Sequence, residues 1–187
     1  MAVSVTHPHL AGFLRFMDFS GGAEGGVGRL AKLVRSFIGA RIVNRVVAIA
    51  DNDTAAYDAL SELKRDVPEN YRIVHYPDLP LLASYPTLGP QSTDPVFMNV
   101  NGKAGSLEMY LGRDLLTVNG ALVPVRWEGY VKGQENHQGA IDDGHKRRIR
   151  KDFERKARAA RRDLAVVATQ DWSGVAAILE TILTAFD

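Results

Sequence analysis

Apolar and polar positions in the first half of the chain form short apolar runs separated by stretches with helical spacing. The apolar runs at residues 13–19, 42–50 and 71–76 have the length and the β-branched or aromatic content of buried strands. Residues 27–39 and 54–65 place their apolar side chains three and four positions apart, which is typical of a helix with one buried face. This alternation predicts an α/β fold in which a parallel sheet carries helices on both faces.

The second half of the chain mixes polar stretches with two amphipathic helices. The predicted elements are, in order, a long loop over 77–106, a short helix over 106–116, a hairpin turning at Asn119-Gly120, a strand to residue 130, a polar loop over 132–144, a basic helix over 145–162, and an apolar-striped helix over 174–186 capped by Asp171 or Ser173. We therefore predict an α/β core over residues 1–115 and an extension over 116–187 that holds the hairpin and the C-terminal helices.

The overall composition is that of an ordinary globular protein. Hydrophobic residues make up 45% of the chain and charged residues 24%, with a formal net charge of +1, so any affinity for nucleic acid must come from local charge. The absence of cysteine excludes disulfides, cysteine-ligated zinc and thiol catalysis. Because the sequence also shows no signal peptide and no apolar segment long enough to span a bilayer, we expect a cytoplasmic protein without a membrane partner.

Acidic residues gather where the predicted strands end. Asp51 and Asp53 follow the second strand, while Asp18 and Asp78 lie at or just past the ends of the first and the third. Parallel sheets collect their ligands at this edge, and two carboxylates two positions apart leave an extended chain on the same side. Such a pair repels itself unless a cation lies between, and hard oxygen ligands suit Mg²⁺ or Mn²⁺. In the alternative interpretation, Asp53 caps the helix beginning at Thr54, which leaves Asp51 without a role.

Two further glutamates have two interpretations each. Glu108 falls in the first turn of the predicted helix 106–116, where it is either a solvated side chain or a group that reaches the sheet edge. Glu24 lies within the glycine-rich segment 21–26. In one interpretation it faces a ligand, and in the other the glycines only form a turn and Glu24 binds nothing. This segment lacks the GxxxxGK[ST] pattern of a phosphate-binding loop.

The helix predicted over residues 145–162 carries ten Lys or Arg against two acids. Such a helix can neutralise phosphates, or it can be a solvated helix that packs Ile149, Phe153 and Ala157 inward. The candidate nucleic-acid-binding residues are Arg147, Arg148, Arg150, Lys151 and Arg155.

The segment RVVAIADNDTAAYDAL at residues 45–60 resembles the Asp-x-Asp segment of Toprim domains, most closely those of HEPN-Toprim and OLD-like nucleases. The resemblance is also carried by MDFSGGAEGGVGRLAKLVRSF, YPDLPLLASYPTLGP, NVNGKAGSLEMYLGRDLL and QDWSGVAAILETIL. It implies a Rossmann-like core in which Asp51 and Asp53 bind Mg²⁺ for phosphoryl transfer on nucleic acid. It further implies that Glu108 is a metal ligand, and that Lys146 is a catalytic residue that neutralises transition-state charge.

One segment of the family pattern is missing from this sequence. Toprim domains normally begin with a strand that ends in a catalytic glutamate, followed by a helix, before the strand that corresponds to residues 13–19. The resemblance therefore implies either a truncated start or a protein that has lost its general acid or base.

Three functions are compatible with these patterns. The first is Mg²⁺-dependent cleavage or phosphoryl transfer on DNA or RNA, in an anti-phage or repair system, by an active or inactive module. The second is a non-catalytic module for nucleic-acid binding or assembly. Both functions are compatible with a monomer or a homo-oligomer. The third is a phosphatase of the haloacid-dehalogenase type, although Thr54 follows Asp53 one position too early for that motif.

Overall fold

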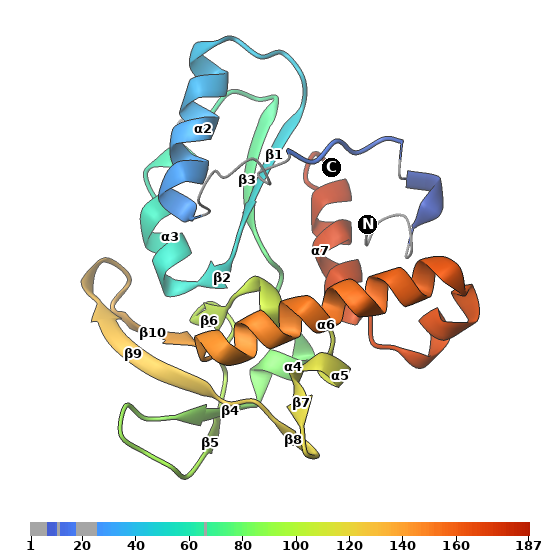
Figure 1. Cartoon of the computed structure of the whole chain (residues 1–187). Coiled ribbons are helices and arrows are strands. Elements are labelled where there is room, and N and C mark those ends of the chain that lie inside the picture. Colours follow the sequence, from blue (N-terminus) through green and yellow to red (C-terminus); the bar gives the residue numbers. More distant parts are fainter. Residues whose placement is uncertain (1–6, 11, 18–25, 66) are drawn as a thin grey trace.

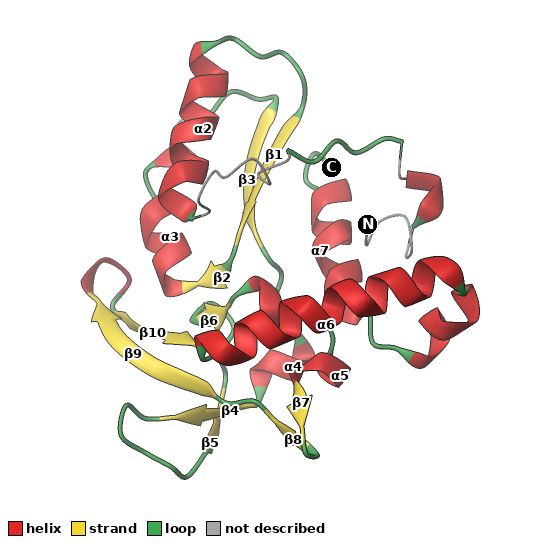
Figure 2. Ribbon diagram, in the orientation of Figure 1, coloured by secondary structure: helices red, strands yellow, loops and turns green. Residues whose placement is uncertain are grey.

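Helices and short strands alternate along the chain and form an α/β fold (Figures 1 and 2). The computed structural model describes residues 7–10, 12–17, 26–65 and 67–187. The α-helices are α2 (Val27–Gly39), α3 (Thr54–Leu60), α4 (Pro80–Ala83), α5 (Arg113–Leu116), α6 (Asp143–Arg162) and α7 (Ser173–Leu183). The 3₁₀ helices are η1 (Pro8–Leu10), η2 (Leu63–Arg65), η3 (Leu107–Tyr110), η4 (Lys132–Gln134) and η5 (Leu164–Thr169). The strands are β1 (Val46–Ala50), β2 (Asn52–Asp53), β3 (Tyr71–His75), β4 (Tyr85–Leu88), β5 (Val96–Met98), β6 (Ala104–Gly105), β7 (Thr117–Val118), β8 (Ala121–Leu122), β9 (Val125–Val131) and β10 (Asn136–Ala140).

β1 and β3 form the parallel pair that the sequence predicts. Val46 lies opposite Tyr71, and the register continues to Ala50 opposite His75. Helices α2 and α3 cover one face of this pair (Figure 1). The small side chains of Ala48 and Ala50 are buried beneath these helices, which allows the helices to approach the strands closely. The predicted β-α-β unit over residues 46–75 is therefore confirmed.

The rest of the predicted parallel sheet is not formed by the described residues. Residues 13–17 form no strand, and the end of that predicted strand, including Asp18, lies outside the described residues. The sheets are small, and the largest is a mixed sheet in the order β10-β9-β4-β5. This sheet joins residues 85–98 to residues 125–140, on either side of the predicted boundary at residue 115.

Two predicted loops contain strands, so those predictions were wrong. Segment 77–106 holds α4, β4, β5 and β6, and segment 132–144 holds η4 and β10. Their polar composition is offset by specific partners: the buried Tyr85 hydroxyl donates to the Val123 carbonyl at 2.9 Å, and the Thr87 hydroxyl donates to the Val96 carbonyl at 2.8 Å. The hairpin at Asn119-Gly120 is confirmed as β7–β8.

The basic helix α6 is fixed to the body by a buried lysine. Lys156 is almost fully buried, and its ammonium donates to the Asp114 carboxylate at 2.9 Å, to the Leu111 carbonyl at 3.1 Å, and to the Asp171 carbonyl. It also lies over the ring of Trp172, 4.8 Å from the centroid. This one charge therefore joins α6 to α5 and to the segments that precede α5 and α7. Among the described residues, no helix is long and apolar enough to cross a membrane.

Candidate functional site

The Asp51–Asp53 segment is held in place by the buried side chain between its two carboxylates. Asn52 is fully buried, where it donates to Asp78 at 2.9 Å and accepts from the Tyr57 hydroxyl at 3.0 Å. Gly105 of β6 lies directly against it, since a Cβ at Gly105 would be 2.6 Å from the Asn52 carbonyl oxygen. Because side chains alternate along an extended chain, fixing Asn52 inward turns both aspartates toward the opposite side.

Asp53 caps helix α3, as one of the two interpretations predicts. Its Oδ1 accepts from the Ala56 N–H at 2.8 Å, and its Oδ2 accepts from the Gln138 side-chain amide at 3.1 Å. Gln138 lies in β10, which was predicted as loop, so no pattern in the sequence pointed to it. Each carboxylate oxygen offers more than one lone pair, so these two bonds leave Asp53 with acceptor capacity.

Asp51 carries negative charge that its surroundings compensate poorly. Partial burial raises the pKa of its carboxyl to about 6, and the nearby charges of Asp53 and Glu108 contribute to the rise. The Leu107 N–H and the charge of Lys146 oppose this change without cancelling it. The backbone of Asp51 is fixed separately, because the Nδ1–H of His75 donates to its carbonyl at 2.8 Å while the His75 ring stacks on Tyr57.

Glu108 is buried, so the interpretation as a solvated side chain was wrong. It lies in the first turn of η3 with 1% of its surface exposed. Its Oε2 accepts from the Ser106 hydroxyl at 2.9 Å, and its Oε1 accepts from the Arg150 guanidinium of α6. Both oxygens of Glu108 therefore have protein partners already.

The structure brings Lys146 to the same region. Lys146 lies in the first turn of α6, 3.9 Å from Asp143, and its charge acts on the Asp51 carboxyl. Asp51, Asp53, Glu108 and Lys146 come from distant parts of the sequence and meet near the carboxyl end of β1. Among the described residues, however, no group of three His, Asp or Glu side chains is arranged to hold a metal ion. Glu24 lies outside the described residues.

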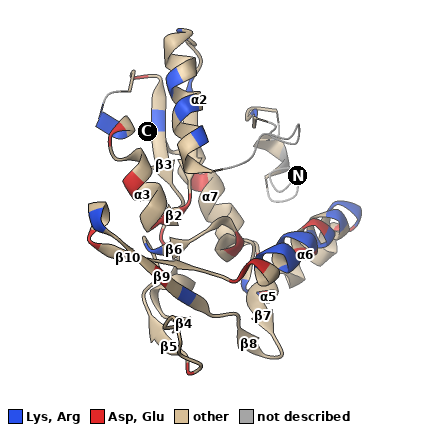
Figure 3. Ribbon diagram, turned by 60° about the vertical axis from the view of Figure 1, so that its left-hand side comes forward, with Lys and Arg blue, Asp and Glu red and all other residues tan. Residues whose placement is uncertain are grey.

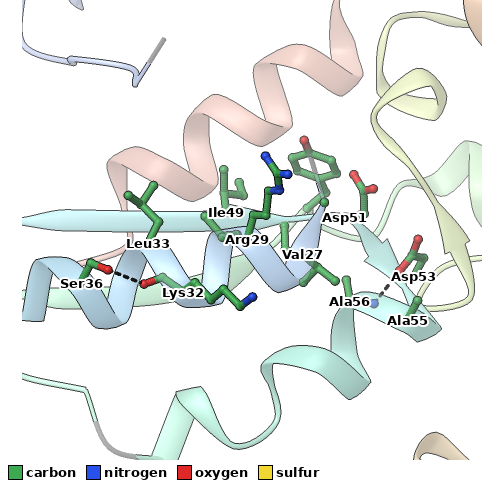
Figure 4. A pocket seen from close by; sticks show the side chains of 14 residues that line it. Val27, Arg29, Lys32, Leu33, Ser36, Ile49, Asp51, Asp53, Ala55 and Ala56 are labelled. Atoms are coloured by element: carbon green, nitrogen blue, oxygen red, sulfur yellow. Dashed lines mark hydrogen bonds between the residues drawn. The ribbon is translucent and has the colours of Figure 1, made fainter. Parts of the chain in front are cut away.

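A pocket of about 540 Å³ opens beside the two aspartates (Figure 4). Its apolar wall is formed by α2 and β1 and includes Leu30, Leu33 and Ile49. Asp51 and Asp53 lie toward one end, and Arg29 and Lys32 of α2 lie along it.

The candidate basic residues of α6 divide into two groups. Arg150 pairs with Glu108, and Arg148 donates to the Leu115 carbonyl at 3.0 Å, so both help to attach the helix. Arg147, Lys151 and Arg155 are exposed and recur along one face of α6, whose Lys and Arg residues are all blue in Figure 3; two exposed arginines absent from the predicted set continue this face. We call the following residues the basic stripe: Arg147, Lys151, Arg155, Arg158 and Arg162.

The basic stripe follows from helical spacing alone. Its members recur three or four positions apart, which keeps them on one helix face over roughly 22 Å. Two of its members have acidic neighbours on the same helix, Asp152 at 3.1 Å from Arg155 and Glu154 at 3.6 Å from Arg158. Exposed pairs of this kind are weak, so the stripe keeps an excess of positive charge.

Comparisons with protein-family models, with curated proteins and with solved structures found no significant match to this chain.

Proposed function

We propose that this chain is a Toprim-like module for Mg²⁺-dependent phosphoryl transfer or phosphodiester cleavage on nucleic acid. The observation that supports this most strongly is the position of Asp51 and Asp53, which follow the carboxyl end of a parallel strand pair and line one pocket. Paired carboxylates next to a pocket favour a bound cation.

The donor set fits Mg²⁺ or Mn²⁺ through two residues. Asp51 and Asp53 line the same pocket, and Mg²⁺ commonly takes one or two protein carboxylates while keeping several waters. Glu108 is the weaker candidate ligand, because its side chain is 1% exposed and its charge is paired with the Arg150 guanidinium. When bound, such an ion polarises a phosphodiester and lowers the pKa of a coordinated water.

The protein's own basic groups supply the remaining parts of the proposal. Lys146 lies where it can neutralise negative charge that develops near Asp51. From there α6 leads away from the site, and the basic stripe along it offers successive contacts for a phosphate backbone. A nucleic acid on the stripe would therefore extend toward the two aspartates.

A nicking assay on supercoiled DNA, with a parallel assay on RNA, tests the catalytic proposal. We expect product only with Mg²⁺ or Mn²⁺, and a loss of product in Asp51→Asn and Asp53→Asn. Asp58→Asn, an exposed aspartate on neighbouring α3, serves as the matched control and should retain activity. Cleavage that persists in EDTA, or in both site variants, would contradict the proposal. Hydrolysis of a simple phosphate monoester instead would favour a phosphatase.

A second function, nucleic-acid binding without turnover, is favoured by one observation. Glu108 is neutralised by Arg150 and acts as an anchor for α6, which leaves two carboxylates in the candidate site. This module would bind DNA or RNA through the basic stripe and show no cleavage with any divalent metal.

Salt dependence of binding tests the basic stripe in either case. Neutralising Arg147, Lys151 and Arg155 with glutamine should reduce the slope of log affinity against log salt by about 3 for duplex DNA. Arg35→Gln, an exposed arginine on α2, is the control. An unchanged slope in the triple variant would show that nucleic acid does not use this face.

A further inference from the structure

The segment around β5 leaves its apolar side chains uncovered. Residues 91–99 are all exposed, and they include Val96 at 62%, Phe97 at 64% and Met98 at 43%. β5 lies at the opposite end of the molecule from α2 (Figure 1), and every residue from 67 to 187 is described. The three apolar side chains are adjacent and expose about 300 Å² together, and a contiguous apolar patch of this size is often an interaction surface.

β5 is an edge strand, and Pro86 fixes which of its backbone groups face outward. Among the described residues β5 pairs only with β4, with Pro86 opposite Phe97 and Thr87 opposite Val96. A hydrogen-bonded pair of an antiparallel ladder exchanges two bonds, which proline cannot do because it lacks an N–H. Phe97 is therefore in a non-hydrogen-bonded pair. Its N–H and C=O point away from β4, while those of Val96 and Met98 point toward it.

This outward edge is complementary to an identical edge turned by 180°. When two β5 strands run antiparallel about a two-fold axis at Phe97, the two Phe97 residues exchange N–H···O bonds, and their rings lie on the same face of the shared sheet. On the other face Val96 of each chain lies opposite the partner's Met98. Apolar side chains therefore meet on both faces of the paired strands.

The distribution of charge permits the same pairing. Asp94 is the one charged residue in segment 89–102. In the antiparallel register centred on Phe97, the two Asp94 side chains fall at opposite ends of the strand pair, about 20 Å apart, where salt screens their repulsion. β5 also carries no lysine, the residue with which exposed edge strands commonly block pairing.

We propose that β5 is a dimerisation edge, at which two copies of this chain pair antiparallel about Phe97 and join their mixed sheets into one. The strand contacts bury about 600 Å² in total, which is below the size of a stable interface, so the dimer is weak and its population depends on protein concentration. The inference does not depend on the proposed function, because β5 contributes no residue to the pocket that Asp51 and Asp53 line.

Sedimentation velocity of the full chain tests self-association. We expect a monomer at about 10 μM and a growing dimer fraction toward about 1 mM. Phe97→Lys places two like charges opposite each other at the axis and should weaken dimerisation by at least about tenfold. Phe13→Lys, at a phenylalanine that is 82% exposed, is the control and should dimerise as the wild-type chain does. A wild-type chain that remains monomeric at about 1 mM, or a dimer that survives Phe97→Lys, would overturn the proposal.

Cysteine cross-linking tests the register, because the full chain has no cysteine of its own. In the proposed pair, Val96 and the partner's Met98 occupy a non-hydrogen-bonded position with Cα atoms about 4.5 Å apart, within the range of a disulfide. The two Val96 residues lie diagonally, about 7–8 Å apart and outside that range. Val96→Cys mixed with Met98→Cys should therefore form a mixed disulfide as the main product, while either variant alone should form little. Equal cross-linking in all three samples, or none in the mixture, would refute pairing about Phe97.

Discussion

Replacing Asp51 by asparagine should stabilise the metal-free protein at alkaline pH. The pKa of the Asp51 carboxyl is raised from 3.8 to about 6, so the folded chain holds this proton more tightly than the unfolded chain does. Asp51 therefore contributes stability that is complete below about pH 3.8 and is lost as the pH rises through about 6. Asparagine avoids this loss, and its side-chain oxygen can still accept from the Leu107 N–H.

The magnitude follows from the size of the pKa change. A rise from 3.8 to about 6 corresponds to at most about 3 kcal/mol. Because Asp51 is only partly buried, solvent screening reduces this to about 1–2 kcal/mol. For a chain of this length that is a gain of about 2–8 °C in melting temperature.

Thermal melts in EDTA at pH 8 and pH 4 measure this effect. Asp51→Asn should melt above the wild-type chain at pH 8 and close to it at pH 4, while Asp58→Asn should match the wild-type chain at both. A variant that melts below the wild-type chain at pH 8, or one whose difference is independent of pH, would refute the electrostatic description of this site.

Two further substitutions test the scaffold by thermal or denaturant unfolding. Lys156→Met removes the donor that the Leu111 and Asp171 carbonyls share and should cost about 3 kcal/mol. Arg158→Met, on the exposed face of the same helix, should change stability by less than about 0.5 kcal/mol. Gly105→Ala forces a Cβ against the Asn52 carbonyl and should cost about 2 kcal/mol, while Gly129→Ala, where the space is open, should be nearly neutral. If the test substitution and its control changed the free energy of unfolding equally, in either comparison, the result would contradict the assigned contacts.

The parts of the fold that could be predicted from the sequence are those set by local pattern. The apolar run ending at Ala50 and the helical spacing of α2, α3 and α6 depend on neighbours in the chain, and these elements form, although the strand begins only at Val46 and α3 ends at Leu60. β4 and β10 escaped prediction because their polar and proline-containing sequences become strands only through partners far away, as when Thr87 lies opposite Val125.

The candidate site shows the same division. The strand-end position of Asp51 and Asp53 and the cap formed by Asp53 could be predicted from spacing. The burial of Glu108 could not, because it depends on Arg150, which arrives from α6 forty-two residues later. Helical spacing in α6 would have added Arg158 and Arg162 to the predicted basic residues and would have placed Arg148 and Arg150 outside the basic stripe.

Binding of Mn²⁺ to the wild-type chain, followed by electron paramagnetic resonance at pH 8, tests the central claim most directly. The account predicts that Mn²⁺ binds at one site per chain, that Mg²⁺ displaces it, and that Asp51→Asn and Asp53→Asn abolish binding while Asp58→Asn preserves it. A wild-type chain that binds no Mn²⁺, or site variants that bind it as the wild-type chain does, would show that the two aspartates do not form a metal site.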